Sequence, residues 1–169
     1  MGDAPRDEPT AAEIAALQEL LDRSARAASP ALADSVGAAE RQMSAAELLA
    51  FWRTTGLVAM TTVGPAGQPH VAPVHAQLHG ATLRLVVYDN TVRRRDLARN
   101  PRVAFTTWRD GAAVILYGRA REVPGSLRDA RPARSGTQRR VVTIEVALTR
   151  AHAMRAPTPA PAGAAPARG

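Results

Sequence analysis

Hydrophobic and polar residues alternate through the middle of the chain, from about residue 57 to residue 148. Leu83, Leu85 and Val87 share one face of such a run, and residues 140–148 repeat the pattern. An alternation with a period of two is typical of β-strands that bury one face. Turn residues separate the runs, so the pattern predicts a series of antiparallel strands. The six predicted strands span residues 57–63, 68–77, 82–88, 102–108, 112–123 and 140–148.

Three other segments carry helix signals. Two of them begin with a capping-box sequence, a Thr or Ser followed three residues later by Glu, and continue with apolar residues at helical spacing. The third begins after a run of cap residues and ends before a proline. The predicted helices span residues 11–27, 44–56 and 92–99.

The strand count indicates a mainly β fold. Six strands joined by short turns favour a closed antiparallel barrel, although a sandwich has the same number of strands. Pro73 lies inside the second predicted strand. A proline there marks an edge strand, a bulge or a place where the ladder opens.

Composition excludes several chemistries. The chain has no cysteine, which excludes disulfides, thiolate catalysis and cysteine-ligated metals. No apolar run reaches the ~20 residues of a membrane-spanning helix. The N-terminus is acidic and polar, unlike a secretory signal. We therefore expect a cytoplasmic protein without a membrane partner.

The charge of the chain is positive. The formal net charge is +7, and the basic residues are arginine without any lysine. A basic balance favours an anionic partner, and arginine suits bidentate phosphate contacts. A composition rich in Arg, Ala, Gly and Pro is also typical of GC-rich genomes, so the charge alone is weak evidence. Nucleic-acid binding needs exposed aromatic residues, and two Phe, two Tyr and two Trp are few for that purpose.

Three of the four histidines, His70, His75 and His79, lie close together in the sequence. His70 and His79 flank predicted turns. His70 and His75 are separated by an odd number of residues, so they point to opposite faces of one strand. This spacing argues against a two-histidine metal site, and we expect no metal. His75 is either a proton donor near a ligand or a half-exposed strand residue, and the second interpretation is favoured.

Residues 89–97 combine a helix N-terminus, a hydroxyl and three arginines. Unpaired backbone N–H groups and the helix dipole favour an anion at such a position. The Thr91 hydroxyl can donate to a phosphate, and Arg93 can add a charge-assisted hydrogen bond. The alternative is a solvated basic helix start, in which an arginine pairs with Asp89 or Asp96. These residues by themselves leave both interpretations open.

The motifs around this segment occur in a recognisable order. A Gly-x-Pro-x-x-x-Pro-Val strand (67–74) precedes a hairpin, the Thr-x-Arg helix, an Asn-Pro-Arg-Val strand (100–103) and a strand that carries Gly118. This order resembles the pyridoxamine 5'-phosphate oxidase-like, FMN-binding split-barrel family, over residues 47–123 and the last strand. The resemblance implies a mainly β (α+β) fold: a six-stranded antiparallel split β-barrel with short flanking helices and an N-terminal helix. The implied regions are an N-terminal helix and linker (1–43), a flavin-binding split-barrel domain (44–152) and a disordered Pro/Ala-rich tail (153–169).

The resemblance also implies a homodimer that binds a flavin-type cofactor at the subunit interface. The cofactor is FMN in most members, the deazaflavin coenzyme F-420 in one branch, and haem in some others. The helix would hold the phosphate, while the second strand and the end of the third would line the ring. The implied cofactor-binding residues are Ala72, Pro73, Val74, His75, Val87, Tyr88, Thr91 and Arg93.

Two departures from the family pattern limit what the resemblance implies. The oxidase carries Arg where Ala72 stands and a second basic residue where Val92 stands, so vitamin B6 oxidation is not assigned. The leading hypothesis is a flavin-dependent oxidoreductase that transfers a hydride to or from a small organic substrate, with no catalytic residue assigned. FMN is the first choice of cofactor and F-420 the alternative. The alternative function is a non-catalytic flavin- or haem-binding split-barrel module.

Overall fold

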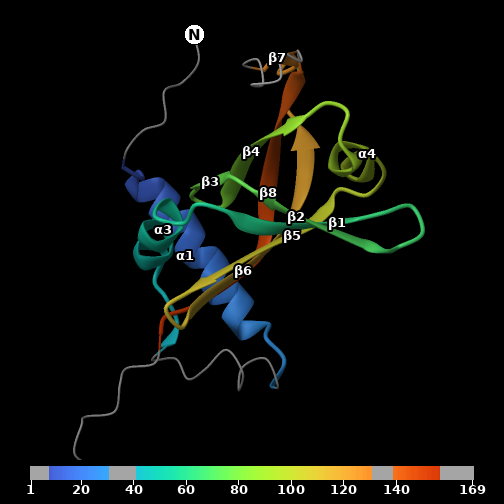
Figure 1. Cartoon of the computed structure of the whole chain (residues 1–169). Coiled ribbons are helices and arrows are strands. Elements are labelled where there is room, and N and C mark those ends of the chain that lie inside the picture. The colour runs from blue at the N-terminus through green and yellow to red at the C-terminus, as the bar shows by residue number, and fades with distance from the viewer. Residues whose placement is uncertain (1–7, 31–40, 131–138, 157–169) are drawn as a thin grey trace, which may run out of the picture.

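The computed structural model describes residues 8–30, 41–130 and 139–156. Within them, eight strands form one antiparallel sheet that curls on itself, and helices lie against it (Figure 1). The strand order is β2-β1-β5-β6-β8-β4-β3, and β7 pairs with β8 beside this path. The strands are β1 (Val58–Val63), β2 (Pro69–Val74), β3 (Ala76–His79), β4 (Thr82–Tyr88), β5 (Arg102–Arg109), β6 (Ala112–Glu122), β7 (Arg128–Asp129) and β8 (Arg140–Met154).

The predicted mainly β split barrel is confirmed, with three differences in the strands. The second predicted strand is divided into β2 and β3. β8 continues to Met154, beyond the predicted end at Leu148. The prediction stops short because the last residues of the strand include Ala151 and Ala153, which give no clear alternation of hydrophobic and polar positions. The short strand β7 was not predicted. Most of the predicted linker and of the C-terminal tail lies outside the described residues, as does part of the loop before β8.

One stretch of chain, residues 69–79, closes the barrel. Its first half, β2, pairs with β1, and its second half, β3, pairs with β4 at the opposite end of the strand order. The division between the two strands falls at His75, shortly after Pro73. α3 (Ala45–Arg53) supports this bend, because Trp52 Nε1 donates to the Ala76 carbonyl at 2.8 Å. His75 Nδ1 also lies 2.8 Å from the Gly56 carbonyl oxygen.

The concave side of the curled sheet holds the hydrophobic core. Each strand contributes its inward-pointing alternate residues, as a period of two requires. Phe105, Met60, Leu116 and Ile144 are among the largest side chains that are almost completely buried there. The core is mostly aliphatic, as the low aromatic content leads one to expect.

Helices cover the open ends and one side of the sheet. Both predicted capping boxes are formed, at Thr10 and at Ser44. The second helix ends before Gly56, where the Thr55 hydroxyl donates to the Phe51 carbonyl. Among the described residues, none of the helices has the length and apolar character needed to cross a membrane. The helices are α1 (Ala11–Arg26), α3 (Ala45–Arg53) and α4 (Val92–Arg99).

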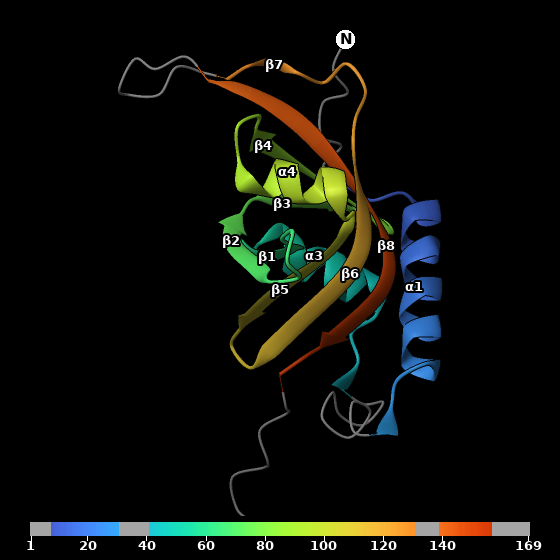
Figure 2. The ribbon, with the colours of Figure 1, turned by 90° about the vertical axis from the view of Figure 1, so that its right-hand side faces the viewer.

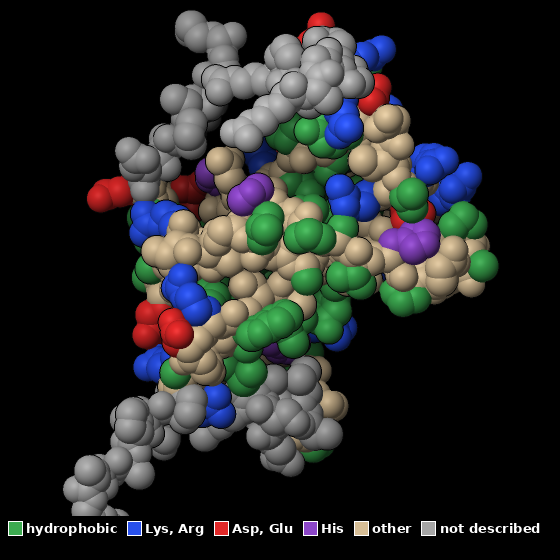
Figure 3. Space-filling view, in the orientation of Figure 1, with side chains coloured by type: hydrophobic (Ala, Val, Ile, Leu, Met, Phe, Trp, Pro, Cys, Tyr) green, Lys and Arg blue, Asp and Glu red, His purple; other side chains and the backbone are tan. Residues whose placement is uncertain are grey.

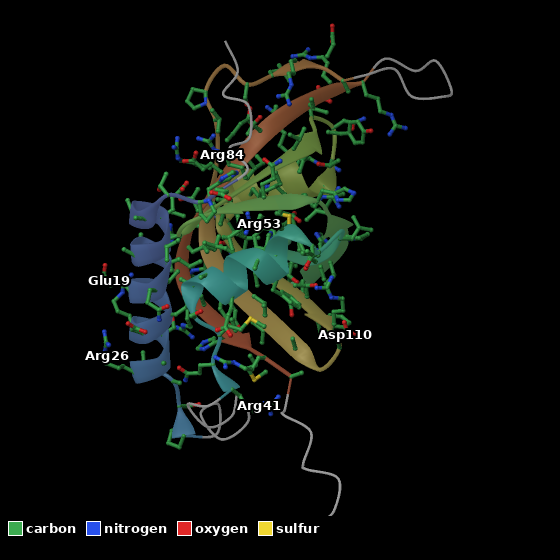
Figure 4. All side chains as sticks on the ribbon, turned by 90° about the vertical axis from the view of Figure 1, so that its left-hand side faces the viewer. Glu19, Arg26, Arg41, Arg53, Arg84 and Asp110 are labelled. Carbon is green, nitrogen blue, oxygen red and sulfur yellow. The ribbon has the colours of Figure 1, made fainter. Side chains whose placement is uncertain are left out.

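α1 lies along the C-terminal part of β8 (Figure 2). Its apolar side, which includes Leu20, is buried in the core. The Ser24 hydroxyl accepts a hydrogen bond from the Ala151 backbone N–H at 3.0 Å. Glu19 and Arg26 point away from the sheet on the opposite side of the helix (Figure 4). The N-terminal helix is therefore a packed part of the folded unit.

The chain before α3 continues this cover along β8. The Met43 N–H donates to the Ala153 carbonyl at 3.0 Å, and the Arg155 N–H donates to the Arg41 carbonyl at 2.8 Å. β4 has already ended its pairing with β8 at Ala147. Segments from the N-terminal part of the chain thus hydrogen-bond the stretch of β8 that β4 does not reach.

A β-bulge in β8, opposite Tyr117 and Gly118 of β6, lies beside a glycine. The register between β6 and β8 shifts between Tyr117 and Gly118. A Cβ atom at Gly118 would lie 2.5 Å from Cγ1 of Val146 and 2.7 Å from the carbonyl oxygen of Ala147. Such distances are too short for any side chain, so β6 and β8 approach each other closely only with glycine here.

We expect Gly118→Ala to lower the free energy of unfolding by about 1–3 kcal/mol, because the methyl group forces the two strands apart. Urea denaturation followed by circular dichroism measures this change. Gly56→Ala is the matched control, since nothing lies within 4 Å of an added Cβ at that position. Equal denaturation midpoints for the two variants would show that the close contact is unimportant.

Candidate functional site

The helix α4 packs against β1, β4 and β6. Thr91 is its N-cap: the hydroxyl accepts from the Arg94 N–H at 3.4 Å and donates to the Tyr88 carbonyl at 2.9 Å. The predicted helix start is therefore confirmed. No described residue accepts the backbone N–H of Val92 or Arg93. These are two of the donors that every helix start leaves without an intrahelical partner.

Neighbouring arginines of α4 have different surroundings. Arg94 makes two hydrogen bonds to the Glu122 carboxylate, at 2.8 and 3.0 Å, and a third to the Asp89 carbonyl. Arg93 is half-buried, and its Nε atom is buried without a hydrogen-bond partner among the described residues. The predicted alternative of an arginine paired with a nearby carboxylate thus applies to Arg94, with a different partner. Arg93 keeps a donor that nothing in this part of the chain uses.

A buried carboxylate ties α4 to the β1–β2 hairpin. Asp96 is 1% exposed. Its Oδ2 atom accepts a hydrogen bond from the Thr62 hydroxyl at 2.8 Å and lies 2.7 Å from His70 Nδ1. The sequence pattern does not reveal this cluster, because its members come from three separate elements, β1, β2 and α4. The available signal was a charged residue directly before Leu97 on the buried side of a short helix.

The surroundings of Asp96 act on its pKa in opposite directions. Burial raises the pKa, whereas the hydrogen bonds from His70 and Thr62 and the positive charge of Arg99 lower it. The lowering effects are larger together, so the pKa of Asp96 lies below its ordinary value. The carboxylate is therefore ionised inside the fold at neutral pH, and its negative charge is balanced by donors rather than by an arginine contact.

The eight predicted cofactor residues fall into two groups. One group, around the start of α4, comprises the end of β4 with Val87 and Tyr88, followed by the helix start. The other follows β2 and its bend. Asp96 connects the groups, because it reaches from α4 to His70 on β2. The first group is Val87, Tyr88, Thr91 and Arg93, and the second is Ala72, Pro73, Val74 and His75.

These residues do not share one face of the sheet. Val74 and Val87 are buried on the concave side, and Ala72 lies on the same face of β2 as Val74. Pro73 and Tyr88 are exposed on the other side, and Arg139 lies over the Tyr88 ring at 5.0 Å. A single ligand that met all the predicted residues would therefore have to reach both surfaces of the barrel wall.

The histidines are placed differently from the sequence interpretation. His70 is part of β2 and contacts Asp96, so it does more than flank a turn. His75 lies at the bend between β2 and β3 and is exposed, which fits the favoured interpretation. His152, on β8, is buried, and burial followed by the charge of Arg150 lowers its pKa. Within the described ranges, no three His, Cys, Asp or Glu side chains are placed to hold a metal ion.

The convex side of β2, β1, β5 and β6 carries an exposed apolar patch. Val71, Thr61, Ala104 and Tyr117 form one row of cross-strand neighbours over these four strands. Val71 is 65% exposed and Tyr117 40%, while Trp108 further along β5 is 71% exposed. Hydrophobic side chains gather on this face of the molecule (Figure 3). We call Val71, Trp108 and Tyr117 the convex patch.

The curled antiparallel sheet, closed by one bent strand and capped by the arginine-bearing helix α4, defines a split-barrel protein. Residues 44–155 match the family model described as pyridoxamine 5'-phosphate oxidase. Since the match covers more than half of the chain, the protein belongs to the pyridoxamine 5'-phosphate oxidase family. No curated protein is significantly similar to the sequence.

Solved structures share this fold at low sequence identity. A conserved protein from Mycobacterium tuberculosis is 18% identical with a TM-score of 0.56, over 69% of this chain and 88% of that one. A FAD-binding protein from Mesorhizobium loti is 17% identical with a TM-score of 0.53, over 69% and 98%. The haem-storage protein of Vibrio cholerae is 12% identical with a TM-score of 0.50, over 64% and 93%. At these identities the likeness concerns the fold alone.

We expect Asp96→Asn to flatten the loss of stability in acid. The pKa of Asp96 is lowered in the folded chain, so the ionised carboxylate stabilises the fold above its unfolded pKa of ~3.9. That stabilisation disappears as the pH falls through the lower, folded value. Unfolding midpoints between pH 3 and pH 7 measure the difference. Asp129→Asn, at an exposed position of β7, is the control, and the same acid dependence in both variants would count against a structural role for Asp96.

Proposed function

We propose that this protein is a flavin-dependent oxidoreductase of the cytoplasm that acts as a homodimer on a small organic substrate. The observation that carries the proposal is Arg93, whose buried Nε atom has no partner among the described residues, beside the open backbone donors of the α4 N-terminus. Membership of the pyridoxamine 5'-phosphate oxidase family supports it. The Mesorhizobium loti relative, whose name records FAD binding, adds that a split barrel of this kind accepts a flavin.

The residues at the start of α4 suit a phosphate group. A phosphate offers several acceptor oxygens, and arginine supplies charge-assisted donors that match them. In the proposed site Arg93 would pair with the phosphate, and the N–H groups of Val92 and Arg93 would donate to it. The Thr91 hydroxyl already donates to the Tyr88 carbonyl, so it would have to rotate to reach the ligand.

The ring of the cofactor would lie beside β2. Ala72, Pro73 and Val74 belong to β2 and His75 lies at its bend, while Val87 and Tyr88 end β4, which pairs with β3. A flavin supplies the hydride exchange itself, so the protein has to bind, orient and shield the ring. For that reason we assign no catalytic side chain. FMN is the proposed cofactor, and F-420, which also carries a ring system and a phosphate, is the alternative.

A non-catalytic binding module is the second candidate. Val92, where a second basic residue is expected from the family pattern, is 46% exposed and offers no charge to a phosphate. A weaker or different ligand site is consistent with storage or transport of a flavin or of haem, and the Vibrio cholerae relative is named for haem storage. Turnover of a hydride donor by the cofactor-loaded protein supports the enzyme, whereas stable binding without turnover supports the module.

We expect Arg93→Glu to weaken binding of the phosphate-bearing cofactor by at least about tenfold, because a charge-assisted hydrogen bond is replaced by like-charge repulsion. Fluorescence titration with FMN and, separately, with F-420 measures the affinity and identifies the cofactor. Arg95→Glu is the matched control: it changes the charge equally on an exposed side of the same helix. Equal affinities of the two variants would place the phosphate elsewhere.

We expect Trp108→Asp to convert a homodimer into a monomer. Exposed apolar patches on soluble proteins often mark association sites, and Trp108 is the most exposed member of the convex patch. Sedimentation velocity over a concentration series measures the change. Val86→Asp alters an exposed residue of β4 outside the patch and should remain a dimer. A Trp108→Asp protein that stays dimeric would exclude the convex patch as the interface.

A further inference from the structure

Two arginines lie directly opposite each other on the convex side of the sheet. Arg102 of β5 is the register partner of Arg119 of β6, so their Cβ atoms lie about 5 Å apart. Both side chains are exposed, and neither has a hydrogen-bond or ion-pair partner among the described residues. Like charges in this arrangement destabilise a sheet. The fold therefore gains no stability from the pair, whereas an anion from outside would relieve the repulsion.

A second row of charges runs beside this pair. Arg121 of β6 and Arg84 of β4 lie on either side of Glu145 of β8. Both donate to its carboxylate, Arg84 through Nε and Nη2 at 3.2 and 3.1 Å. Burial raises the pKa of Glu145, but the hydrogen bonds from Arg84 and Arg121 and their charges lower it by more, so the carboxylate is ionised at neutral pH. Its charge orients two arginine side chains that remain 54% and 64% exposed.

The two rows together form one positively charged surface, the arginine face, which consists of Arg84, Arg102, Arg119 and Arg121. Arg119 and Arg121 lie on the same side of β6, about 7 Å apart along the strand. Glu145 is the only carboxylate in the described part of these rows. Figure 2 shows β6 and β8, which carry the centre of the surface, side by side. The other members of the rows are small or polar: Ala147, Thr82, His79 and Gln77.

The arginine face adjoins the convex patch at Tyr117, two residues before Arg119 on β6, and extends away from it toward β4. Arg150 of β8 lies over the Tyr117 ring at 5.6 Å and adds a positive charge at this border. The two surfaces are therefore neighbours that differ in chemistry, since one is apolar and the other is cationic.

The composition of the arginine face matches a nucleic acid better than a protein partner. The core of a protein–protein interface is depleted in charged residues, whereas interfaces with nucleic acid are polar and strongly positive. Arginine forms bidentate hydrogen bonds to phosphate, and such contacts hold the backbone of a nucleic acid without reading its bases. The chain has few aromatic residues for base stacking, but contacts to phosphates alone do not require them.

The curvature of the sheet favours a single strand over a duplex. Double-stranded DNA is stiff over about 50 nm, so it touches a convex surface along only a short length. A single strand bends more easily and can follow the surface. Successive phosphates can then reach arginines that lie about 5–7 Å apart in two rows.

We propose that the arginine face binds the phosphate backbone of single-stranded nucleic acid without reading its sequence. The phosphates lie over Arg102 and Arg119, whose charges are unpaired within the described chain, and continue across the second row toward Arg84. The proposal does not rest on the proposed function, because none of these arginines is among the proposed cofactor contacts.

The test is fluorescence anisotropy of a labelled deoxythymidine strand of about 20 nucleotides, titrated with the full chain between about 50 and 200 mM salt. The logarithm of the affinity should fall with the logarithm of the salt concentration with a slope of about −3, as roughly four phosphate contacts to a single strand require. A deoxyadenosine strand should give the same slope, because the bases are not read.

A variant that combines Arg102→Gln with Arg119→Gln should bind at least about tenfold more weakly and lose about 1 to 1.5 of the slope. It removes a like-charge repulsion, so its urea denaturation midpoint should not fall below that of the wild type. The matched control combines Arg23→Gln with Arg26→Gln, which removes the same charge from exposed positions of α1 and should bind like the wild type. Equal affinities and slopes of the two variants would overturn the proposal.

A second measurement uses the wild type alone, so it does not depend on whether a variant folds. In ¹⁵N-labelled protein, the amide resonances of Arg119 and Arg121 should shift when the deoxythymidine strand is added, and those of Arg23 and Arg26 should not. The same titration with a duplex of equal length and with polyglutamate of equal charge identifies the partner. Tighter binding of the duplex excludes a single strand, and equal or tighter binding of polyglutamate indicates an acidic protein instead. Either result, or no binding of any probe at the lowest salt, overturns the proposal.

Discussion

The architecture depends on one continuous stretch of chain, β2 followed by β3, whose two halves pair with different strands. Residues 69–79 join β1 over their first half and β4 over their second, and these are opposite ends of the strand order. A straight strand cannot do this, so the chain has to bend at His75. The bend is stabilised from outside the sheet by Trp52 and by the loop at Gly56. Packing of α3 and closure of the barrel are therefore parts of the same interaction.

The candidate site depends on that closure. Because β2 lies at the edge of the barrel, His70 can contact α4 there. The contact is between the His70 ring and the Asp96 carboxylate, which joins the helix to the strand. A buried carboxylate is costly unless donors surround it, and Thr62 and His70 supply them. The position of Arg93 relative to β2 is thus set by a polar contact inside the wall, in addition to the apolar packing of Leu97.

The strands and helix starts could be predicted because their signals are local. Alternation identifies each long strand, and Thr91 caps α4 through atoms three residues away. The contact between His70 and Asp96 joins residues 26 positions apart and depends on how β2 meets α4, which no local pattern encodes. The same limit explains the arginines: spacing suggested a paired arginine, but only the fold brings Glu122 to Arg94 and leaves Arg93 without a partner.

The end of β8 has a consequence for how copies of this chain behave in solution. Beyond Ala147 its outer edge is no longer paired with β4, and an uncovered edge is a template on which another chain can add a strand. Ser24 and Met43 hydrogen-bond this stretch instead, and Arg41 bonds Arg155 directly after it. The N-terminal segments thereby act as a guard against intermolecular strand addition. A protein cut before residue 44 would keep the residues matched by the family model and lose its protection against aggregation.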